Sequence, residues 1–382
     1  MSKRINNTGS ITFHKATNRF MGRVTVGRDI NGKLIKKYVY GKTEAEVSQA
    51  IIKIQSEVND NNFFEPSKMT LKQWLKQWFE VYKGNNIKEQ TKELYEIIIR
   101  TIINPNIGDT QLRNLKPLHI QAFINKLYDF GEGYSTSTIQ KVKNILNPAF
   151  KMAIVNKLIS SNPCEGLQMP KQTQKEVVAF TRDEQSKFEE SAKNHPFYEA
   201  FIFALDTGVR CGELLALHWN DIDLKNGIVK VSKTLITVHD KKLGKQIVKV
   251  QNTPKTQQGN REIPLTLRCI SMLKELKKQR LQEGFNDRNI VFCSLVGTYQ
   301  FPKNFRRAMG IVCKNAKVQS GGVHILRHTF ATRLFEEKVQ PKVVSKLLGH
   351  SKIEVTLNTY THLVQENTNE AINVLNNLKL VK

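Results

Sequence analysis

The sequence predicts a multidomain α+β protein, and three observations lead to that prediction. The chain has 382 residues, whereas a typical domain has about 100 to 200. Strand-like segments open the chain, helical periodicity follows, and the last block passes from helices to strands and back to helices. Lys and Arg number 59 against 34 Asp and Glu, a net charge of +25, so we expect a polyanionic partner.

Nucleic acid fits this charge better than a membrane does. No apolar run approaches the roughly 18 residues that span a bilayer, and the N-terminus, MSKRINNTGS, lacks the apolar segment of a signal peptide. We therefore expect a soluble, cytoplasmic protein. The scattered cysteines predict reduced thiols rather than disulfides or a cysteine-rich zinc site; they are Cys164, Cys211, Cys269, Cys293 and Cys313.

Residues 1–60 predict a small three-stranded sheet with one helix. Three segments rich in β-branched and aromatic residues, 9–15, 19–26 and 34–41, are separated by turn-like stretches. Thr43 and Glu46 form a capping box for a helix that runs to about Val58. We expect the sheet to be covered by Ala45, Ile51, Ile52 and Ile54.

This first block is also strongly basic. Ten basic residues lie in residues 1–43 against one acidic residue, Asp29. Either the block binds DNA, or it is a solvated basic hairpin with no partner. The candidate DNA contacts are Arg4, Lys15, Arg19, Arg23, Lys36 and Lys37.

Residues 67–170 predict an all-helical domain of four or five helices. Apolar residues recur at three- and four-residue spacing from Met69 to about Met169, after a polar linker. Ser135 to Thr138 supply capping residues, and Pro105, Pro117 and Pro148 are expected to punctuate the helices. A second linker ends near Thr181.

Residues 178–382 predict a mixed, mainly helical domain with a small antiparallel sheet. Thr181 and Glu184 form a capping box that opens it. Strand-like segments follow at 227–238, 245–256 and 261–265, and helical periodicity returns from about Leu265.

Two motifs supply arginines suited to an anion. In HILRHTFATRLF, Leu326, Phe330 and Leu334 predict a buried stripe, with His324 and Arg327 beside it near the helix start. In TGVRCGELLAL, Arg210 lies at a helix entrance and Glu213 follows one turn later, where it could hold a neighbouring cation. Two guanidinium forks can grip one phosphodiester. Taken alone, a structural histidine and a surface arginine also explain the first motif.

A third motif lies near the C-terminus. In PKVVSKLLGHS, Pro341 suits a first helical turn, Gly349 a C-terminal cap, and His350 follows at the negative end of the helix dipole. That position favours protonated His350. Ser351 and Glu354 form a capping box for a short helix leading to Tyr360, although an isolated tyrosine is usually a packing residue.

Other motifs carry no prediction of chemistry. GKT at 41–43 lacks the upstream glycine of a P-loop, because position 36 is Lys. Asp221 and Asp223 fit a turn better than a metal site. We therefore expect neither a metal nor a nucleotide cofactor.

The ordered set of motifs resembles the active site of tyrosine recombinases, the phage-integrase family. The resemblance adds Lys255, in TPKTQQGNREIPL, to Arg210, His324, Arg327, His350 and Tyr360. It implies that residues 67–170 are a core-binding domain and residues 178–382 the catalytic domain, with residues 1–60 similar to an arm-type DNA-binding domain. Ile325 departs from the polar residue that many relatives carry there.

The resemblance implies a reaction and an assembly. Tyr360 would attack DNA to give a 3′-phosphotyrosyl link, and a tetramer would exchange strands through a Holliday junction. Expected partners are core and arm-type DNA sites and DNA-bending or excision proteins. The tail after His362 would dock on a neighbouring protomer or on its own domain.

Three alternatives share features with this interpretation. A housekeeping chromosome-dimer resolvase or a type IB topoisomerase-like enzyme would use the same six groups, but the resolvase usually lacks the basic first block. A non-catalytic DNA-binding protein would keep the charge without needing those groups.

Overall fold

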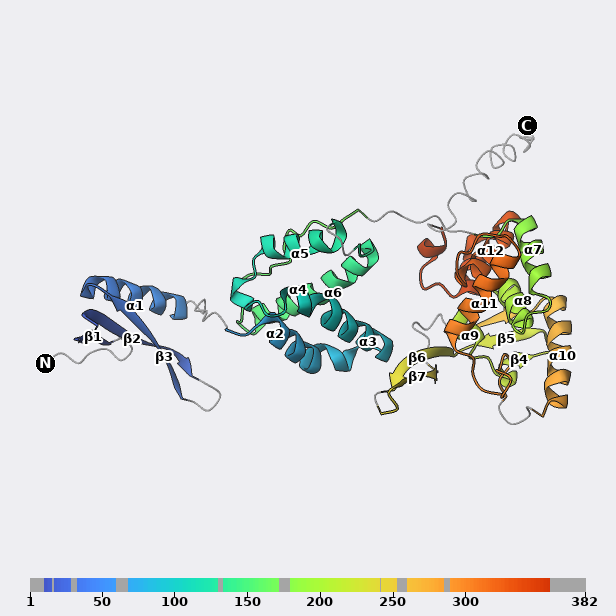
Figure 1. Cartoon of the computed structure of the whole chain (residues 1–382), viewed down its shortest axis with the longest axis horizontal. Helices are drawn as coiled ribbons and strands as arrows, with labels where there is room; N and C mark the ends of the chain where they lie inside the picture. The colour runs from blue at the N-terminus through green and yellow to red at the C-terminus, as the bar shows by residue number, and fades with distance from the viewer. Residues whose placement is uncertain are drawn as a thin grey trace, which may run out of the picture. The chain divides into compact units, whose positions relative to one another are not determined.

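The computed structural model describes residues 10–357 except 16, 29–32, 60–67, 130–132, 172–178, 241, 253–259 and 285–288. The chain divides into two compact units, Met1–Gln172 and Thr173–Lys382. The first unit contains a small sheet with one helix and then a group of helices, and the second unit combines helices with short strands (Figure 1). Among the described residues, no helix combines the length and the apolar composition needed to cross a membrane.

The first unit opens with the predicted antiparallel sheet and helix. The strands pair in the order β1-β2-β3, and their bounds are Ser10–His14, Arg19–Arg28 and Leu34–Gly41, followed by α1, Glu44–Asn59. The predicted capping box is present, because Glu46 N donates to Thr43 Oγ1 at 3.2 Å and Thr43 N to Glu46 Oε2 at 3.4 Å.

The side chains that join α1 to the sheet differ partly from the prediction. Val47, Ile51 and Ile54 are buried against Val24, whereas Ala45 is exposed and Ile52 is 62% exposed. The helix lies so close that a Cβ on Gly22 would meet Val47 Cγ1 at 2.5 Å. This close approach selects the 47, 51, 54 stripe, so the prediction of Ala45 and Ile52 was wrong.

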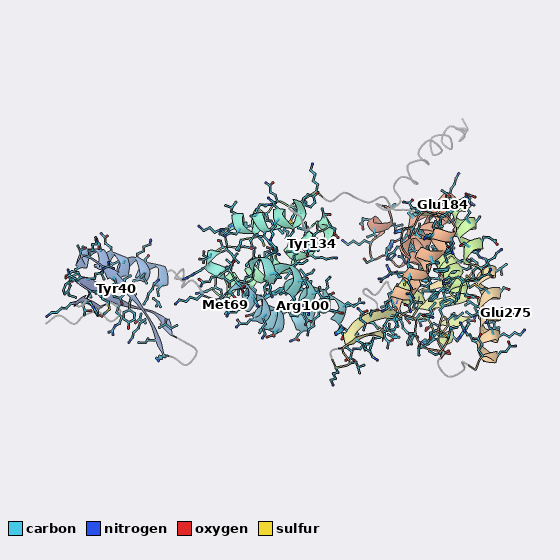
Figure 2. All side chains as sticks on the ribbon, in the orientation of Figure 1. Tyr40, Met69, Arg100, Tyr134, Glu184 and Glu275 are labelled. Atoms are coloured by element: carbon cyan, nitrogen blue, oxygen red, sulfur yellow. The ribbon has the colours of Figure 1, made fainter. Side chains whose placement is uncertain are left out.

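The rest of the first unit is helical, as predicted. Two helices each continue through a π-helical turn. The elements are α2 Leu71–Trp78, η1 Phe79–Lys83, η2 Gly84–Asn86, α3 Glu89–Ile98, η3 Ile99–Ile103, α4 Asn104–Ile107, η4 Leu112–Asn114, α5 Pro117–Asp129 and α6 Thr136–Val155. Met69 and Tyr134, labelled in Figure 2, pack against the core of these helices.

Of the three prolines expected to punctuate these helices, only Pro117 does so. Pro117 begins α5, but Pro105 lies at the start of α4 within a continuous helix, and Pro148 lies inside α6. A proline in a helix interior removes one hydrogen bond and costs about 3 kcal/mol. The flanking Leu146, Ala149 and Phe150 are fully buried, and their packing outweighs that cost.

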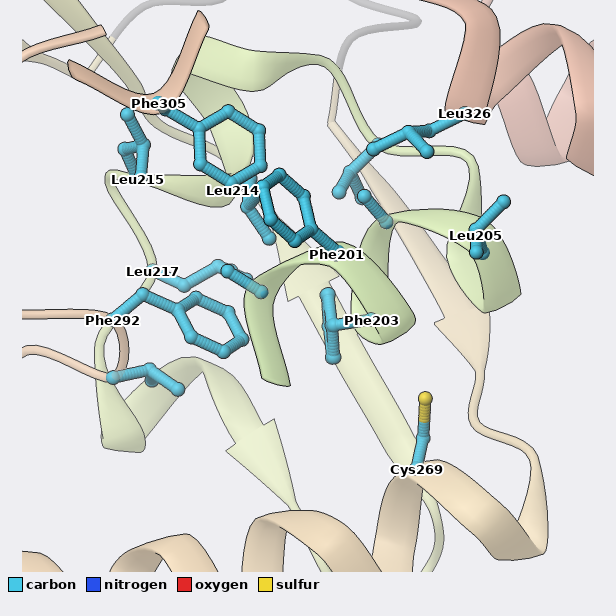
Figure 3. Close-up of a cluster of buried hydrophobic side chains, with 14 of the residues drawn as sticks. Phe201, Phe203, Leu205, Leu214, Leu215, Leu217, Cys269, Phe292, Phe305 and Leu326 are labelled. Carbon is cyan, nitrogen blue, oxygen red and sulfur yellow. The ribbon is translucent and has the colours of Figure 1, made fainter. Parts of the chain in front are cut away.

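The second unit is built around α8, a helix that is almost entirely buried. Its bounds are Tyr198–Thr207, and it packs against α7, α9, α10 and α12. The buried aromatic rings of Phe201, Phe203, Phe292 and Phe305 fill the centre of this core (Figure 3).

The strands of the second unit form two small antiparallel sheets, whereas the sequence predicted one. Their orders are β4-β5-β8 and β6-β7. The predicted segment 227–238 divides into two strands that lie in different sheets, and the short strand at 222–223 was not predicted. The elements of the unit are α7 Arg182–Ala192, α9 Cys211–Leu214, η5 Trp219–Asp221, β4 Ile222–Asp223, β5 Ile228–Val231, β6 Thr234–Asp240, β7 Lys245–Gln251, β8 Arg261–Pro264, α10 Leu267–Gln282, α11 Pro302–Asn315, α12 His324–Glu336 and α13 Pro341–Leu348.

Candidate active site

Arg210 lies at the entrance of α9, where the sequence places it. Gly208 ends α8 in the left-handed conformation, with φ of +63°, and the chain then turns so that Arg210 is the N-cap residue of α9. Glu213 holds Arg210 twice: Arg210 N donates to Glu213 Oε2 at 2.9 Å, and Nη1 donates to Oε1 at 2.8 Å. The Arg210 side chain is 38% exposed, so it can still meet a ligand.

Glu213 is itself buried between two arginines. Its second partner is Arg261, whose Nη2 donates to Oε2 at 2.8 Å and whose Nη1 donates to Oε1 at 3.3 Å. Burial alone would raise the pKa of Glu213, but the hydrogen bonds and charge of Arg261, together with Arg210, lower that pKa to about 2. The carboxylate is therefore ionised at any physiological pH.

Arg327 is more deeply placed than the sequence indicated. Arg327 is only 5% exposed, whereas the helical pattern predicted that it would lie at the rim of the core. Nη1 donates to Gly208 O at 2.8 Å and Nη2 to Leu348 O at 2.7 Å. These bonds to the C-terminal ends of two helices, α8 and α13, fix the plane of the guanidinium.

The C-terminal end of α13 joins the three arginines. The last carbonyls of a helix have no partner within it, and here three successive ones accept from three guanidiniums. Arg261 Nε donates to Leu347 O at 2.6 Å, Arg327 Nη2 to Leu348 O, and Arg210 Nη2 to Gly349 O at 3.3 Å. The predicted αL cap is present, with Gly349 φ of +67°, and His350 follows directly.

His324 and His350 are both neutral near pH 7. Partial burial is the largest cause that lowers the pKa of His324, followed by Arg327 and Arg210, although its side chain still reaches solvent. Burial likewise lowers the pKa of His350 to about 4, and Arg327, Arg210 and Arg261 add to the effect. The expectation that His350 is protonated was wrong, because desolvation and the arginine charges outweigh the helix dipole.

His350 is linked to the segment that follows it. Its Nδ1 lies 2.7 Å from Oγ1 of the fully buried Thr356. If the hydroxyl donates to Nδ1, the imidazole proton lies on Nε2 and can be donated to a ligand. Residues 353–357 are helical, and in the first turn Val355 N donates to Lys352 O. A Ser351 cap predicts a helix that begins at residue 352, so the observed helix begins one residue later.

The remaining two predicted catalytic residues, Lys255 and Tyr360, lie outside the described residues. Lys255 belongs to the connection that precedes β8. Tyr360 follows the 353–357 helix in the sequence. Tyr299, the other tyrosine considered near this block, has its hydroxyl 2.6 Å from His218 Nε2 and is partly buried.

Sequence reasoning missed three residues of the site. Arg261 has a detectable signal, because the alternation of Arg261, Ile263 and Leu265 puts an arginine on a buried face, where it requires a carboxylate. His328 is the second histidine of HILRH; burial lowers its pKa to about 4, and its ring centroid lies 6.3 Å from that of His324. Arg306 on α11 contributes to lowering the pKa of His324, and no pattern in its segment singled it out.

The basic residues of the first block divide between two faces of the sheet. Register pairs Arg23 with Tyr38 and Thr25 with Lys36, on the face opposite α1, and Arg19 lies two residues before Met21 on that same face. Tyr38 and Tyr40 are about half exposed there. Lys37 pairs with the buried Val24 and so lies on the α1 face. Lys15 is exposed in the first turn, and Arg4 lies outside the described residues.

Two family models match the chain. Residues 173–367 match the phage integrase family, and residues 70–128 match the phage integrase N-terminal SAM-like domain. A protein of Caldanaerobacter subterraneus subsp. tengcongensis named tyrosine recombinase XerC-like is 32% identical over 374 residues, which cover 93% of this chain and 95% of that protein.

Solved structures share the fold. The Tn1549 transposon integrase in complex with a circular intermediate DNA superposes with a TM-score of 0.67 at 23% identity, covering 79% of this chain and 99% of that one. A lambda integrase tetramer bound to a Holliday junction gives a TM-score of 0.57 at 21% identity, covering 92% and 94%. Both confirm the predicted α+β fold class.

Proposed function

The chain belongs to the phage integrase family of tyrosine recombinases, and from that membership we propose the roles of its residues and its DNA partners. It is a site-specific recombinase, an enzyme that cuts and rejoins DNA strands. Its substrate would be double-stranded DNA at the ends of a mobile element, on the bacterial nucleoid in the cytoplasm. Neither ATP nor a metal has a step in the proposed reaction.

The proposed reaction is a transesterification. Tyr360 Oη forms a bond to the scissile phosphorus while the bond from phosphorus to the 5′-oxygen breaks. A free tyrosine has a pKa of about 10, so its proton must leave, and neutral His324 is the acceptor. Lys255 donates the proton that the departing 5′-oxygen needs.

Arg210 and Arg327 would bind the non-bridging oxygens, and His350 would donate through Nε2. The observation that carries this proposal is the convergence of both arginines on the carbonyls of Leu348 and Gly349, directly before His350. One phosphate placed at this point meets fixed cationic donors, which stabilise the charge that develops in the transition state.

The domains would divide the work of DNA binding. We assign residues 67–170 to core-site binding, residues 178–382 to catalysis, and residues 1–60 to arm-type sites. The open face of the first sheet, which carries Arg19, Arg23 and Lys36 beside two exposed tyrosines, supports the last assignment. A tetramer on a Holliday junction, as in the lambda integrase structure, is the assembly we propose, with DNA-bending or excision proteins as further partners.

A nicked suicide duplex tests the proposal. Such a substrate loses a short fragment on cleavage, so the protein stays trapped on the DNA 3′ end. Wild type should give a protease-sensitive adduct without ATP or metal, and peptide mapping should place it on Tyr360. Tyr360→Phe removes one oxygen, so DNA binding should persist while the adduct disappears.

An adduct that persists in Tyr360→Phe, or one joined through a serine to a 5′ end, would overturn the assignment. Tyr299→Phe is the matched control and should leave the adduct in place. Strand exchange between two labelled duplexes then separates the recombinase from a topoisomerase-like enzyme, which would only relax DNA.

A further inference from the structure

Arg261 is a buried charge with no place in the reaction described above. It is the first residue of β8, its side chain is 4% exposed, and it lies behind Glu213. A buried charge is costly unless it is paired and hydrogen-bonded. Arg261 meets that condition at three points: two nitrogens contact the two Glu213 oxygens and Nε donates to Leu347 O.

Glu213 connects this buried charge to the phosphate site. Each of its oxygens accepts from both arginines: Oε1 and Oε2 bind Arg261, and they also bind Nη1 and the backbone N of Arg210. Two guanidiniums around one carboxylate leave a net positive charge. Without Arg261, the Glu213 carboxylate would be paired with Arg210 only. Its charge would then cancel that of Arg210, and the pair would have no net attraction for a phosphate.

The same side chain also holds the helix end that carries His350. Three successive carbonyls at the end of α13 accept hydrogen bonds from the three arginines of the site, and Arg261 donates to the first of them, Leu347 O. A single planar group thereby fixes the distance between α9, which begins beside Arg210, and the end of α13.

We propose that Arg261 is a positioning residue for strand cleavage, which occupies Glu213 and pins the end of α13 so that Arg210 remains available to the scissile phosphate. This inference rests on the proposed function. Arg261 itself does not touch the DNA; it acts through Glu213 and Arg210.

The test measures single-turnover formation of the covalent adduct on two suicide duplexes. One has the natural scissile phosphodiester, and the other has a methylphosphonate there, which carries no charge. Arg261→Gln should slow cleavage of the phosphodiester by about 100-fold, the loss typical of misplaced catalytic groups. On the neutral methylphosphonate its loss should shrink to less than about tenfold, because Arg210 has less charge to stabilise.

Arg268→Gln is the matched control. Arg268 is also ion-paired within the second unit, with Glu189 and Asp206, neither of which is a residue of the site. It should slow both duplexes by the same small factor, and calorimetry should show that both variants fold. Equal losses on the two duplexes for Arg261→Gln would overturn the proposal.

A comparison of Glu213→Gln with the double variant Glu213→Gln/Arg261→Gln tests whether Arg261 acts through Glu213. This comparison can also be made if Arg261→Gln alone does not fold. When added to Glu213→Gln, Arg261→Gln should cost less than about tenfold, because the carboxylate that Arg261 occupies is then neutral and only the bond to Leu347 O is lost. A loss as large as about 100-fold in that background contradicts the proposal. If wild type forms no adduct, the proposed function fails; if wild type reacts and Arg261→Gln keeps its rate, only this inference fails.

Discussion

The arginines of the site show how one residue type serves both structure and binding. Arg327 is buried and donates to carbonyls at the C-terminal ends of α8 and α13, whereas Arg210 remains partly exposed while Glu213 holds it. Burying a guanidinium without partners would be very unfavourable. These donors are therefore held in place before any ligand arrives, so the proposed binding of a phosphate would need little reorganisation.

The neutral His350 predicts that core-site binding depends on pH. In the free protein its pKa is about 4, lowered by burial and by Arg327, Arg210 and Arg261. A bound phosphate is an opposite charge and raises that pKa. Between the pKa of His350 in the free protein and its higher pKa in the complex, the complex binds more protons than the free protein and free DNA do. The affinity for DNA should therefore rise as pH falls through the pKa of the complex, and it should level off near the pKa of the free protein.

Fluorescence anisotropy at constant ionic strength, from about pH 8 to pH 5, measures this effect around the normal imidazole pKa. His324 and His328 also titrate, so the comparison is with His350→Gln, which keeps a group able to bond Thr356. The variant should lose part of the acid-side gain in affinity. Parallel pH profiles for the two proteins would show that His350 does not take up the proton.

The motifs predicted which residues meet at this site, but not their environment. Arg210, His324, Arg327 and His350 were identified from short patterns that each specify a local backbone. The burial of Arg327 and the low pKa of His350 depend on residues more than 100 positions away, such as Gly208 and Arg210. Local patterns contain no information on that surrounding charge and desolvation.

At the scale of the elements, the α8–α9 turn places both arginines. Gly208 has φ of +63°, and a Cβ there would meet Phe330 Cδ1 at 2.4 Å. Gly208→Ala should therefore destabilise the second unit by on the order of 2–4 kcal/mol, from left-handed strain and overpacking. It should also slow cleavage, because the Gly208 carbonyl that orients Arg327 would move.

Gly310→Ala is the control for this substitution. Gly310 lies inside α11, and a Cβ there would meet nothing within 4 Å. Alanine should stabilise such a helix by about 0.5–1 kcal/mol. Calorimetry of both variants, together with adduct rates, checks the prediction; a Gly208→Ala protein that unfolds and cleaves like wild type would contradict it.

Capping and periodicity predicted most elements, since both are local properties. The boxes at Thr43–Glu46 and Thr181–Glu184 form as expected. Pro148 and the α1 stripe were predicted wrongly for a shared reason: tertiary packing chose the outcome. Buried neighbours keep α6 continuous through Pro148, and the glycine at position 22 lets α1 approach on its Val47 side.

At the scale of the whole molecule, element order predicted the α+β fold class, and the ordered motifs predicted the recombinase function through their resemblance to the tyrosine recombinase family. The charge of +25 indicates a polyanion without saying which surface meets it. Strand register divides the basic residues of the first sheet between its two faces, because it puts Arg19, Arg23 and Lys36 on one face and Lys37 on the other. The alternation of side chains along a strand would have predicted the same division if the pairing register of the three strands had been known.

This division predicts which charges bind a separate DNA site. Deleting residues 1–60 should abolish binding to distal sites while core-site cleavage stays measurable. In the full chain, Arg19→Gln with Arg23→Gln should lower the log-log salt slope of distal-site binding by about 0.9 for each phosphate that the protein no longer neutralises. Lys53→Gln removes a charge on the exposed side of α1 and should leave that slope unchanged.

Binding isotherms on separate arm and core duplexes, at several salt concentrations, decide the matter. Because each neutralised phosphate releases counterions, the slope reports how many phosphates the protein meets and not only its affinity. If the deletion weakens core binding as much as distal binding, the first block is part of one continuous DNA surface. If Lys53→Gln changes the slope as much as the sheet variant does, the open face of the sheet is not a distinct DNA-binding surface.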